Sequence, residues 1–156
     1  MAVIDDLVVQ LLGEMAIQLE RCAKPVCQLM FQPGDTTDWA YCDCEGDDCS
    51  GFAYVRLVTS YPSDEFPLQS DGVLCSYPIT HQLEVGVVRC IAVEDEGELP
   101  TKDELTLIAL EQMEDQAALR YAINNAAPRM NSLDNWVPEG PQGGCIGGHW
   151  TLYVSE

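Results

Sequence analysis

The residue types best suited to chemistry in this 156-residue sequence are two histidines and eight cysteines. Histidine is the side chain whose ordinary pKa lies near neutrality, so His81 and His149 are the first candidates for proton transfer. Each is expected to open a strand between large strand residues, which indicates a structural position. The catalytic alternative pairs His149 with the thiol of Cys145 or Cys90. A reactive thiolate needs a positive environment, however, and the chain has only 7 Lys and Arg residues.

Most of the cysteines lie in the first third of the chain: Cys22, Cys27, Cys42, Cys44 and Cys49. The intervals within this group are poor matches to the paired Cys-x2-4-Cys spacing of structural zinc sites. We therefore favour disulfides or free thiols over zinc, although the sequence does not choose among the many pairings that eight thiols allow. The isolated Cys75, Cys90 and Cys145 are expected to be small buried hydrophobic residues.

An acidic, cysteine-rich loop is expected over residues 31–50. Its candidates for a cation site are Asp43, Glu45, Asp47 and Asp48. An EF-hand needs oxygen ligands at alternate positions, a central glycine and a glutamate at position twelve, and this stretch lacks that register. We expect a solvated acidic loop without a metal ion.

The glycines of residues 143–148 do not predict a phosphate-binding loop. No lysine follows them, and a strand rather than a helix is expected next. We expect them to permit a close-packed entry into that strand. The sequence also lacks the common motifs of serine hydrolases, zinc proteases and NTPases, so we expect no enzyme and no cofactor.

The charge of the chain is strongly negative, with 26 Asp and Glu residues and a formal net charge of −19. Such a surface repels phosphate backbones and anionic lipid, so specific nucleic-acid or membrane binding is not expected. No apolar run approaches the roughly 20 residues that cross a bilayer. The sequence starts with two acids where a signal peptide has basic residues, and we expect folding in a cytoplasm.

Hydrophobic periodicity predicts a single α+β domain over residues 1–156. An apolar stripe over residues 4–19 predicts a first helix that ends before Pro25. The other expected elements are three strands, a long loop and a helix that starts with a capping box: strands 51–60, 81–93 and 149–155, loop 61–80 and helix 101–125. Alternation in the strands favours a mainly antiparallel sheet of about four strands with both helices packed on one face.

The second helix has more apolar surface than one face needs. We assign its packed face to Leu105, Ala109, Leu110, Met113, Ala117 and Tyr121. The opposite, polar side is assigned to Glu111, Glu114 and Asp115. Further apolar residues predict contact with a second partner, such as another subunit: Leu107, Ile108, Ala118 and Leu119.

The strand 81–93 is a second candidate for subunit contact. Its alternate residues from Leu83 to Val87 are apolar, and Arg89 interrupts that apolar face. We expect this arginine to reach a carboxylate, to extend to the sheet edge or to contact a neighbouring subunit.

Several segments resemble small neck proteins of long-tailed, siphovirus-type phages that infect actinobacteria, a tail-terminator-like family. The matching segments are Cys42-Asp-Cys-Glu-Gly46, Cys49-Ser-Gly51 leading into Phe52-Ala-Tyr-Val-Arg-Leu57, Leu83-Glu-Val-Gly-Val-Val-Arg-Cys90, Met113-Glu-Asp-Gln-Ala-Ala-Leu-Arg120 and Gly143-Gly-Cys-Ile-Gly-Gly-His-Trp-Thr151. The glycine-rich ending is the most specific of them. His149 departs from the pattern, in which an acid is expected.

The resemblance implies a virion protein without catalytic residues that closes into a hexameric ring on the tail tube and docks the filled head. Its implied partners are copies of itself, the major tail tube protein and a head-completion or stopper protein, with DNA passing through the lumen without specific binding. Assembly would take place in the host cytoplasm. The alternatives are a stopper or adaptor ring, a Cys-rich zinc or redox protein and, disfavoured, an acidic DNA mimic.

Overall fold

A computed structural model describes residues 3–34, 51–71, 77–91, 100–126, 131–142 and 144–156. The elements in chain order are α1 (Val3–Cys22), β1 (Gln28–Gln32), β2 (Phe52–Pro62), β3 (Ile79–Cys90), α2 (Lys102–Ala126), β4 (Asn131–Gln142) and β5 (Cys145–Ser155). The strands form one sheet in the order β1-β2-β3-β5-β4. The pairing of β1 with β2 is parallel and the other three pairings are antiparallel.

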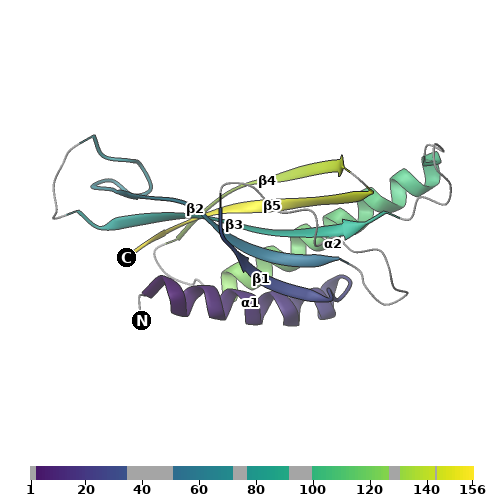
Figure 1. Cartoon of the computed structure of the whole chain (residues 1–156), viewed down its shortest axis with the longest axis horizontal. Coiled ribbons are helices and arrows are strands. Elements are labelled where there is room, and N and C mark those ends of the chain that lie inside the picture. The colour runs from purple at the N-terminus through teal and green to yellow at the C-terminus, as the bar shows by residue number, and fades with distance from the viewer. Residues whose placement is uncertain (1–2, 35–50, 72–76, 92–99, 127–130, 143) are drawn as a thin grey trace.

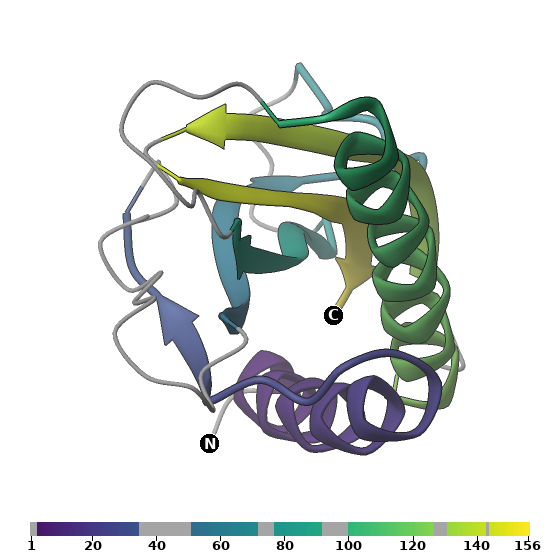
Figure 2. The same ribbon diagram turned by 90° about the vertical axis from the view of Figure 1, so that its right-hand side faces the viewer.

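Both helices lie on the same side of the sheet (Figure 1). In Figure 2 the strands form a curved layer whose inner side faces α1 and α2. The predicted α+β fold, with a mainly antiparallel sheet and both helices on one face, is therefore confirmed. The sheet has five strands rather than about four.

Helix α1 confirms the predicted apolar stripe. Its buried side chains recur at helical spacing: Leu7, Val8, Leu11, Met15 and Leu19. Asp5 and Asp6 lie in the first turn and Arg21 in the last, where the helix dipole favours each charge. The helix ends at Cys22, three residues before Pro25, which cannot continue it.

The main core lies between the helices and the sheet. Strand β3 contributes Leu83, Val85 and Val87 to this core, as its alternation predicts. The neighbouring strands and the helices add Ala53, Val55, Leu152, Val154, Ala118, Leu119, Ala122 and Ile123 to the residues of α1. Burial of each large apolar side chain contributes roughly 1.5–3 kcal/mol relative to exposure.

The two outer strands were not predicted, because their local sequences carry weak strand signals. Strand β1 has five residues, and among the described strands it pairs only with β2. Strand β4 is an edge strand that contains Pro138, and an edge tolerates a residue without an N–H donor. The pairing of β4 with β5 also shifts register between Leu133 and Trp136.

The expected loops begin and end differently from the prediction. Phe31 and Gln32, assigned to the loop 31–50, belong to β1, and residues 35–50 lie outside the described part. The expected loop 61–80 is shorter because β2 continues to Pro62 and β3 begins at Ile79.

The last strand begins at Cys145, four residues earlier than predicted. A Cβ atom on Gly147 would lie 2.3 Å from the carbonyl oxygen of Val87, and one on Gly148 would lie 2.4 Å from a ring carbon of Trp136. Only glycine fits such close approaches. The predicted close-packed entry into this strand is thus confirmed, and the entry is itself part of the strand.

Candidate functional site

His149 lies within β5 on the helix-free side of the sheet, not at the start of a strand as expected. Its imidazole is buried between two carboxylates: Nδ1 lies 3.4 Å from Glu139 Oε1, and Nε2 lies 3.7 Å from Glu84 Oε1. Arg56 completes this set of four, which we name the His149 network. Its Nε donates to Glu84 Oε2 at 3.1 Å, and Nη2 contacts the same oxygen.

The His149 network is suited to holding strands together. Arg56 comes from β2, Glu84 from β3, His149 from β5 and Glu139 from β4. The two carboxylates flank opposite ring nitrogens, so they do not converge with the imidazole on one point. Within the described residues, no group of three or more His, Cys, Asp and Glu side chains is arranged to hold a metal ion. An acid in place of His149 would add a third carboxylate between Glu84 and Glu139, a repulsion that histidine avoids.

His81 lies within β3 and is also buried. Ser60 Oγ lies 2.8 Å from its Nδ1, and Glu156 Oε2 lies 3.5 Å from its Nε2. The three residues come from neighbouring positions of β2 and β3 and from the residue that follows β5. The contact between Ser60 and His81 joins β2 to β3, whereas Nε2 of His81 lies near Glu156 without a hydrogen bond to it. Ser60, His81 and Glu156 line neither the cavity beside α2 nor the cleft beside Tyr153.

The cysteines do not form the Cys–His pair that was the catalytic alternative. Cys145 is disulfide-bonded, so it has no thiol to pair with His149. Cys90 pairs in register with Cys145, whereas His149 pairs with Gly86. The Cys90–Cys145 pair and the Gly86–His149 pair are therefore four residues apart along the strands, a distance of about 13 Å at the usual rise per residue. The Cys–His hypothesis is therefore wrong for both cysteines.

The two described N-terminal cysteines differ in oxidation state. Cys27 is disulfide-bonded, and Cys22 is an exposed free thiol. A zinc site that uses both is not supported, because only thiolate sulfur binds zinc. The other members of this group, Cys42, Cys44 and Cys49, lie outside the described residues, as do the isolated Cys75 and the cation-site candidates Asp43, Glu45, Asp47 and Asp48.

Arg89 reaches a carboxylate, as one of the three expectations proposed. Its Nη2 donates to Asp115 Oδ1 at 2.6 Å, and its Nε donates to Oδ2 at 3.0 Å. The guanidinium also donates to the carbonyl oxygens of Lys24 at 2.7 Å and Pro25 at 3.2 Å. This buried arginine therefore joins β3 to α2 and to the segment between α1 and β1.

Helix α2 packs with a different side from the one predicted. Asp115, assigned to the polar side, is buried together with the aliphatic residues Ala118, Leu119, Ala122, Ile123 and Ala126. The alanines are small, so α1 and the sheet can approach α2 closely on this side. The packed side of α2 is therefore the one with the less apolar sequence. The prediction followed the larger apolar residues, such as Leu110 and Met113, and its assignment of them to the packed face was wrong.

The large apolar residues of α2 are instead exposed. Leu110, Met113 and Tyr121 share one side of the helix, and Leu105 and Leu107 lie in its first turns; we call these five residues together the outer face of α2. Their exposed fractions are 53% for Leu105, 58% for Leu107, 53% for Leu110, 63% for Met113 and 49% for Tyr121. These are five of the eleven large apolar side chains exposed in the described part of the chain. Apolar surface gathered on one helix in this way is typical of a contact surface.

A cavity of about 260 Å³ adjoins the first turns of this outer face. It is lined by Leu107 and Ile108 of α2, by Ile91 after β3 and by Pro100 before α2. Lys24 and Glu111, which form an exposed ion pair, lie at the same cavity. The outer face of α2 is therefore continued by a hollow lined in part by apolar side chains.

Among the described residues, neither helix combines the length and apolar character that a bilayer-spanning segment requires. No protein-family model and no curated protein matches the chain.

Proposed function

We propose that this protein is a structural subunit of the head–tail connection of a long-tailed phage, and that its copies close into a hexameric ring that ends the tail tube and docks the head. The observation that carries the proposal is the outer face of α2, whose large apolar side chains are exposed in the described part of the chain. The segments that resemble phage neck proteins supply the biological setting. A stopper or adaptor ring is the alternative position in the same structure.

A ring requires two different contact surfaces on each subunit, because head-to-tail association joins unlike patches. The outer face of α2 is one of them in this proposal. Strand 81–93 does not serve as the other through its backbone, because β3 lies between β2 and β5 and pairs with both. The edge strand β1 is the better candidate: its outer edge has no partner strand in the described sheet, and Phe31 is half-exposed there.

The opposite edge of the sheet is less suited to strand addition. Strand β4 carries Pro138 and two register shifts, features that prevent a further strand from pairing along it. The two edges thus differ, as a head-to-tail contact requires.

The strong negative charge fits passage of DNA through such a ring. With a net charge of −19, carboxylates that line the bore would repel the phosphate backbone and prevent sticking. A ring with a neutral bore and all carboxylates outside would contradict this part of the proposal.

The test is to incubate the purified chain with tube-forming tail protein and to image the product by electron microscopy. A six-fold ring on one end of each tube is the expected result. Absence from tubes combined with binding to isolated heads would move the protein to the stopper or adaptor position. Binding to neither would overturn the proposal.

Two variants connect this test to the structure. Met113→Glu places a charge in the outer face of α2 and is expected to abolish ring formation, because an unpaired charge is costly at an apolar interface. Gln10→Glu adds the same charge at an exposed position of α1 and is expected to leave rings intact. Both sites are exposed, so the free energy of unfolding should change by less than about 0.5 kcal/mol. Rings formed equally well by both variants would remove α2 from the interface.

A further inference from the structure

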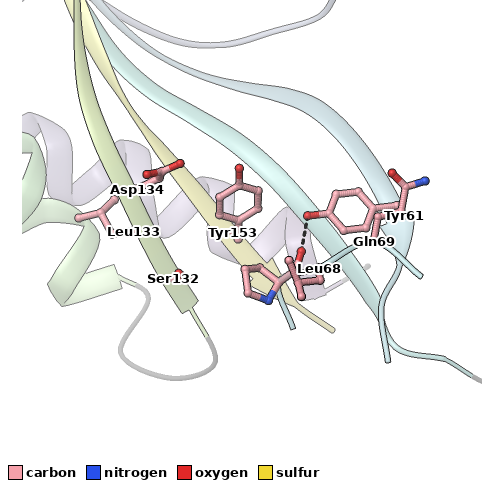
Figure 3. Close-up of a pocket in the computed structure, with 8 residues that line it drawn as sticks. Tyr61, Leu68, Gln69, Ser132, Leu133, Asp134 and Tyr153 are labelled. Atoms are coloured by element: carbon pink, nitrogen blue, oxygen red, sulfur yellow. Dashed lines mark hydrogen bonds between the residues drawn. The ribbon is translucent and has the colours of Figure 1, made fainter. Parts of the chain in front are cut away.

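A cleft of about 410 Å³ opens on the helix-free side of the sheet, near the ends of β2 and β5. Tyr61 of β2 and Tyr153 of β5 lie on its floor, with Leu68 between them and Asp134 of β4 on the far side of Tyr153 (Figure 3). Tyr153 alternates with Leu152, which is in the helix-side core, so its ring points away from the helices. The cleft is therefore separate from the outer face of α2.

The cleft is held in shape by hydrogen bonds that do not depend on a ligand. The hydroxyl of Tyr61 donates to the carbonyl oxygen of Pro67 at 2.7 Å, and buried Ser63 donates through Oγ to the carbonyl oxygen of Leu68 at 2.6 Å. Burial and the neighbouring Tyr153 raise the pKa of Tyr61 above its ordinary value, so this phenol stays neutral. Leu68 itself is 61% exposed at the rim. The wall is thus formed in advance and leaves an apolar side chain open to a partner.

The charges around the cleft are all negative in the described residues. Asp134 lines it and is fixed by the backbone N–H of Asn135, which donates to Oδ1 at 2.8 Å. The segment that forms the opposite wall carries Asp64, Glu65 and Asp71, and no described lysine or arginine lines the cleft. A hydrogen bond from the Ser70 hydroxyl lowers the pKa of Asp64, which keeps that carboxylate charged. The cleft therefore favours a cation and rejects phosphate.

We propose that this cleft binds an arginine-bearing peptide segment of a partner protein. A guanidinium group stacks on a phenol ring while it pairs with a carboxylate, and Tyr153 and Asp134 lie side by side to offer both. The methylene stem of the arginine then contacts Leu68. A purely apolar ligand would leave Asp134 unused, and nucleic acid is repelled. This inference goes beyond the ring proposal and does not rest on it.

The test measures binding of a fluorescein-labelled Gly-Arg-Gly-Arg-Gly peptide by fluorescence anisotropy in about 0.15 M salt, where long-range attraction is screened. Asp134→Asn and Tyr153→Ala are each expected to raise the Kd by about fivefold or more, through loss of the carboxylate and the ring respectively. Tyr153→Phe retains the ring and is expected to bind like the wild-type protein.

The matched control is Glu20→Gln, which removes the same charge at an exposed position of α1. It should change the Kd by less than about twofold, because a distant exposed charge is screened. Equal weakening by Glu20→Gln and Asp134→Asn would show attraction by net charge alone and overturn the proposal, as would no binding of the peptide. Should Tyr153→Ala fail to fold, the exposed Asp134→Asn still decides the outcome.

Discussion

The two sides of the sheet are stabilised by different kinds of contact. On the helix side, a continuous apolar core runs from α1 through α2 to the central strands, and Arg89 with Asp115 forms a buried ion pair between β3 and α2. On the helix-free side, a small apolar cluster around Phe52 and Tyr54 lies on the same strands as the polar His149 network.

The helix side of the sheet mainly stabilises the fold, whereas the helix-free side also offers a surface for binding. The helix side contributes through the large area it removes from water. The helix-free side contributes through polar pairs that must each be satisfied, because a buried charge without its partner is costly. It also retains the cleft beside Tyr153. Substitutions on the two sides should therefore lower the free energy of unfolding by different amounts, and different second substitutions should restore it.

The largest expected effect is loss of the Asp115 carboxylate. Asp115→Ala removes the carboxylate that pairs with the buried guanidinium of Arg89. The free energy of unfolding should fall by about 3–5 kcal/mol, as measured by urea denaturation.

The control for this prediction replaces both partners. Arg89→Met combined with Asp115→Leu removes the two charges together, so it should be clearly more stable than Asp115→Ala alone. A double variant as unstable as the single one would mean that packing around α2, rather than the unpaired charge, sets the cost.

A pair of adjacent residues in β3 compares the two sides directly. Leu83→Ala opens a cavity in the helix-side core and should cost about 3 kcal/mol. Glu84→Gln removes the charge that pairs with Arg56 on the other side and should cost about 2 kcal/mol. Urea denaturation would measure both losses, and a larger cost for Glu84→Gln would reverse the proposed ranking of the two sides.

Volume-conserving substitutions sharpen the same comparison. Leu83→Met should restore most of the stability, with a remaining loss below about 1.5 kcal/mol, because the apolar core accepts another shape of similar size. Glu84→Met should not restore stability, because it removes the carboxylate that pairs with Arg56.

Close packing on the helix-free side is tested at Gly86. A Cβ atom there would lie 2.5 Å from the ring of Tyr54, which crosses the strand at this point. Gly86→Ala should therefore cost about 2 kcal/mol, through displacement of the ring. Combining it with Tyr54→Leu should recover part of the loss, whereas an additive loss would show that the ring is not the obstacle.

Sequence patterns predicted the helix side well because its signals are long and one-sided. Helix α1 has one apolar stripe and β3 has clean alternation, so each pattern has only one way to be buried. The capping box at Thr101 and Glu104 also fixed the start of α2. These features depend only on residues close in sequence.

The remaining features depend on neighbours that are distant in sequence. Helix α2 is apolar on two sides, and only the approach of α1 decides that the alanine side is buried. Strands β1 and β4 are edges with few buried residues, so they lack the pattern of central strands. The His149 network joins four strands whose pairing no local pattern shows. The cleft beside Tyr153 could likewise not be predicted, because its residues meet only through the order of the strands in the sheet.

The smallest effect is expected at the start of α2, outside both sides of the sheet. The backbone N–H of Thr101 donates to Glu104 Oε2 at 2.6 Å, and the N–H of Glu104 donates to Thr101 Oγ1 at 3.3 Å. Thr101→Ala should lower the free energy of unfolding by about 1 kcal/mol at neutral pH. Its effect should not change in combination with Glu84→Gln, because the two sites share no partner.

The pH dependence of this cap follows from Glu104. The hydrogen bonds from Thr101 lower the pKa of Glu104 below its ordinary value of 4.5. A lowered pKa in the folded state means that the cap contributes fully above the ordinary value and is lost as the pH falls through the lowered one. Glu104→Gln should therefore weaken the dependence of stability on pH below about 4.5, as followed by thermal unfolding from neutral to acidic pH. An unchanged dependence would show that the carboxylate does not cap the helix in solution, and would leave Thr101 alone to define where α2 begins.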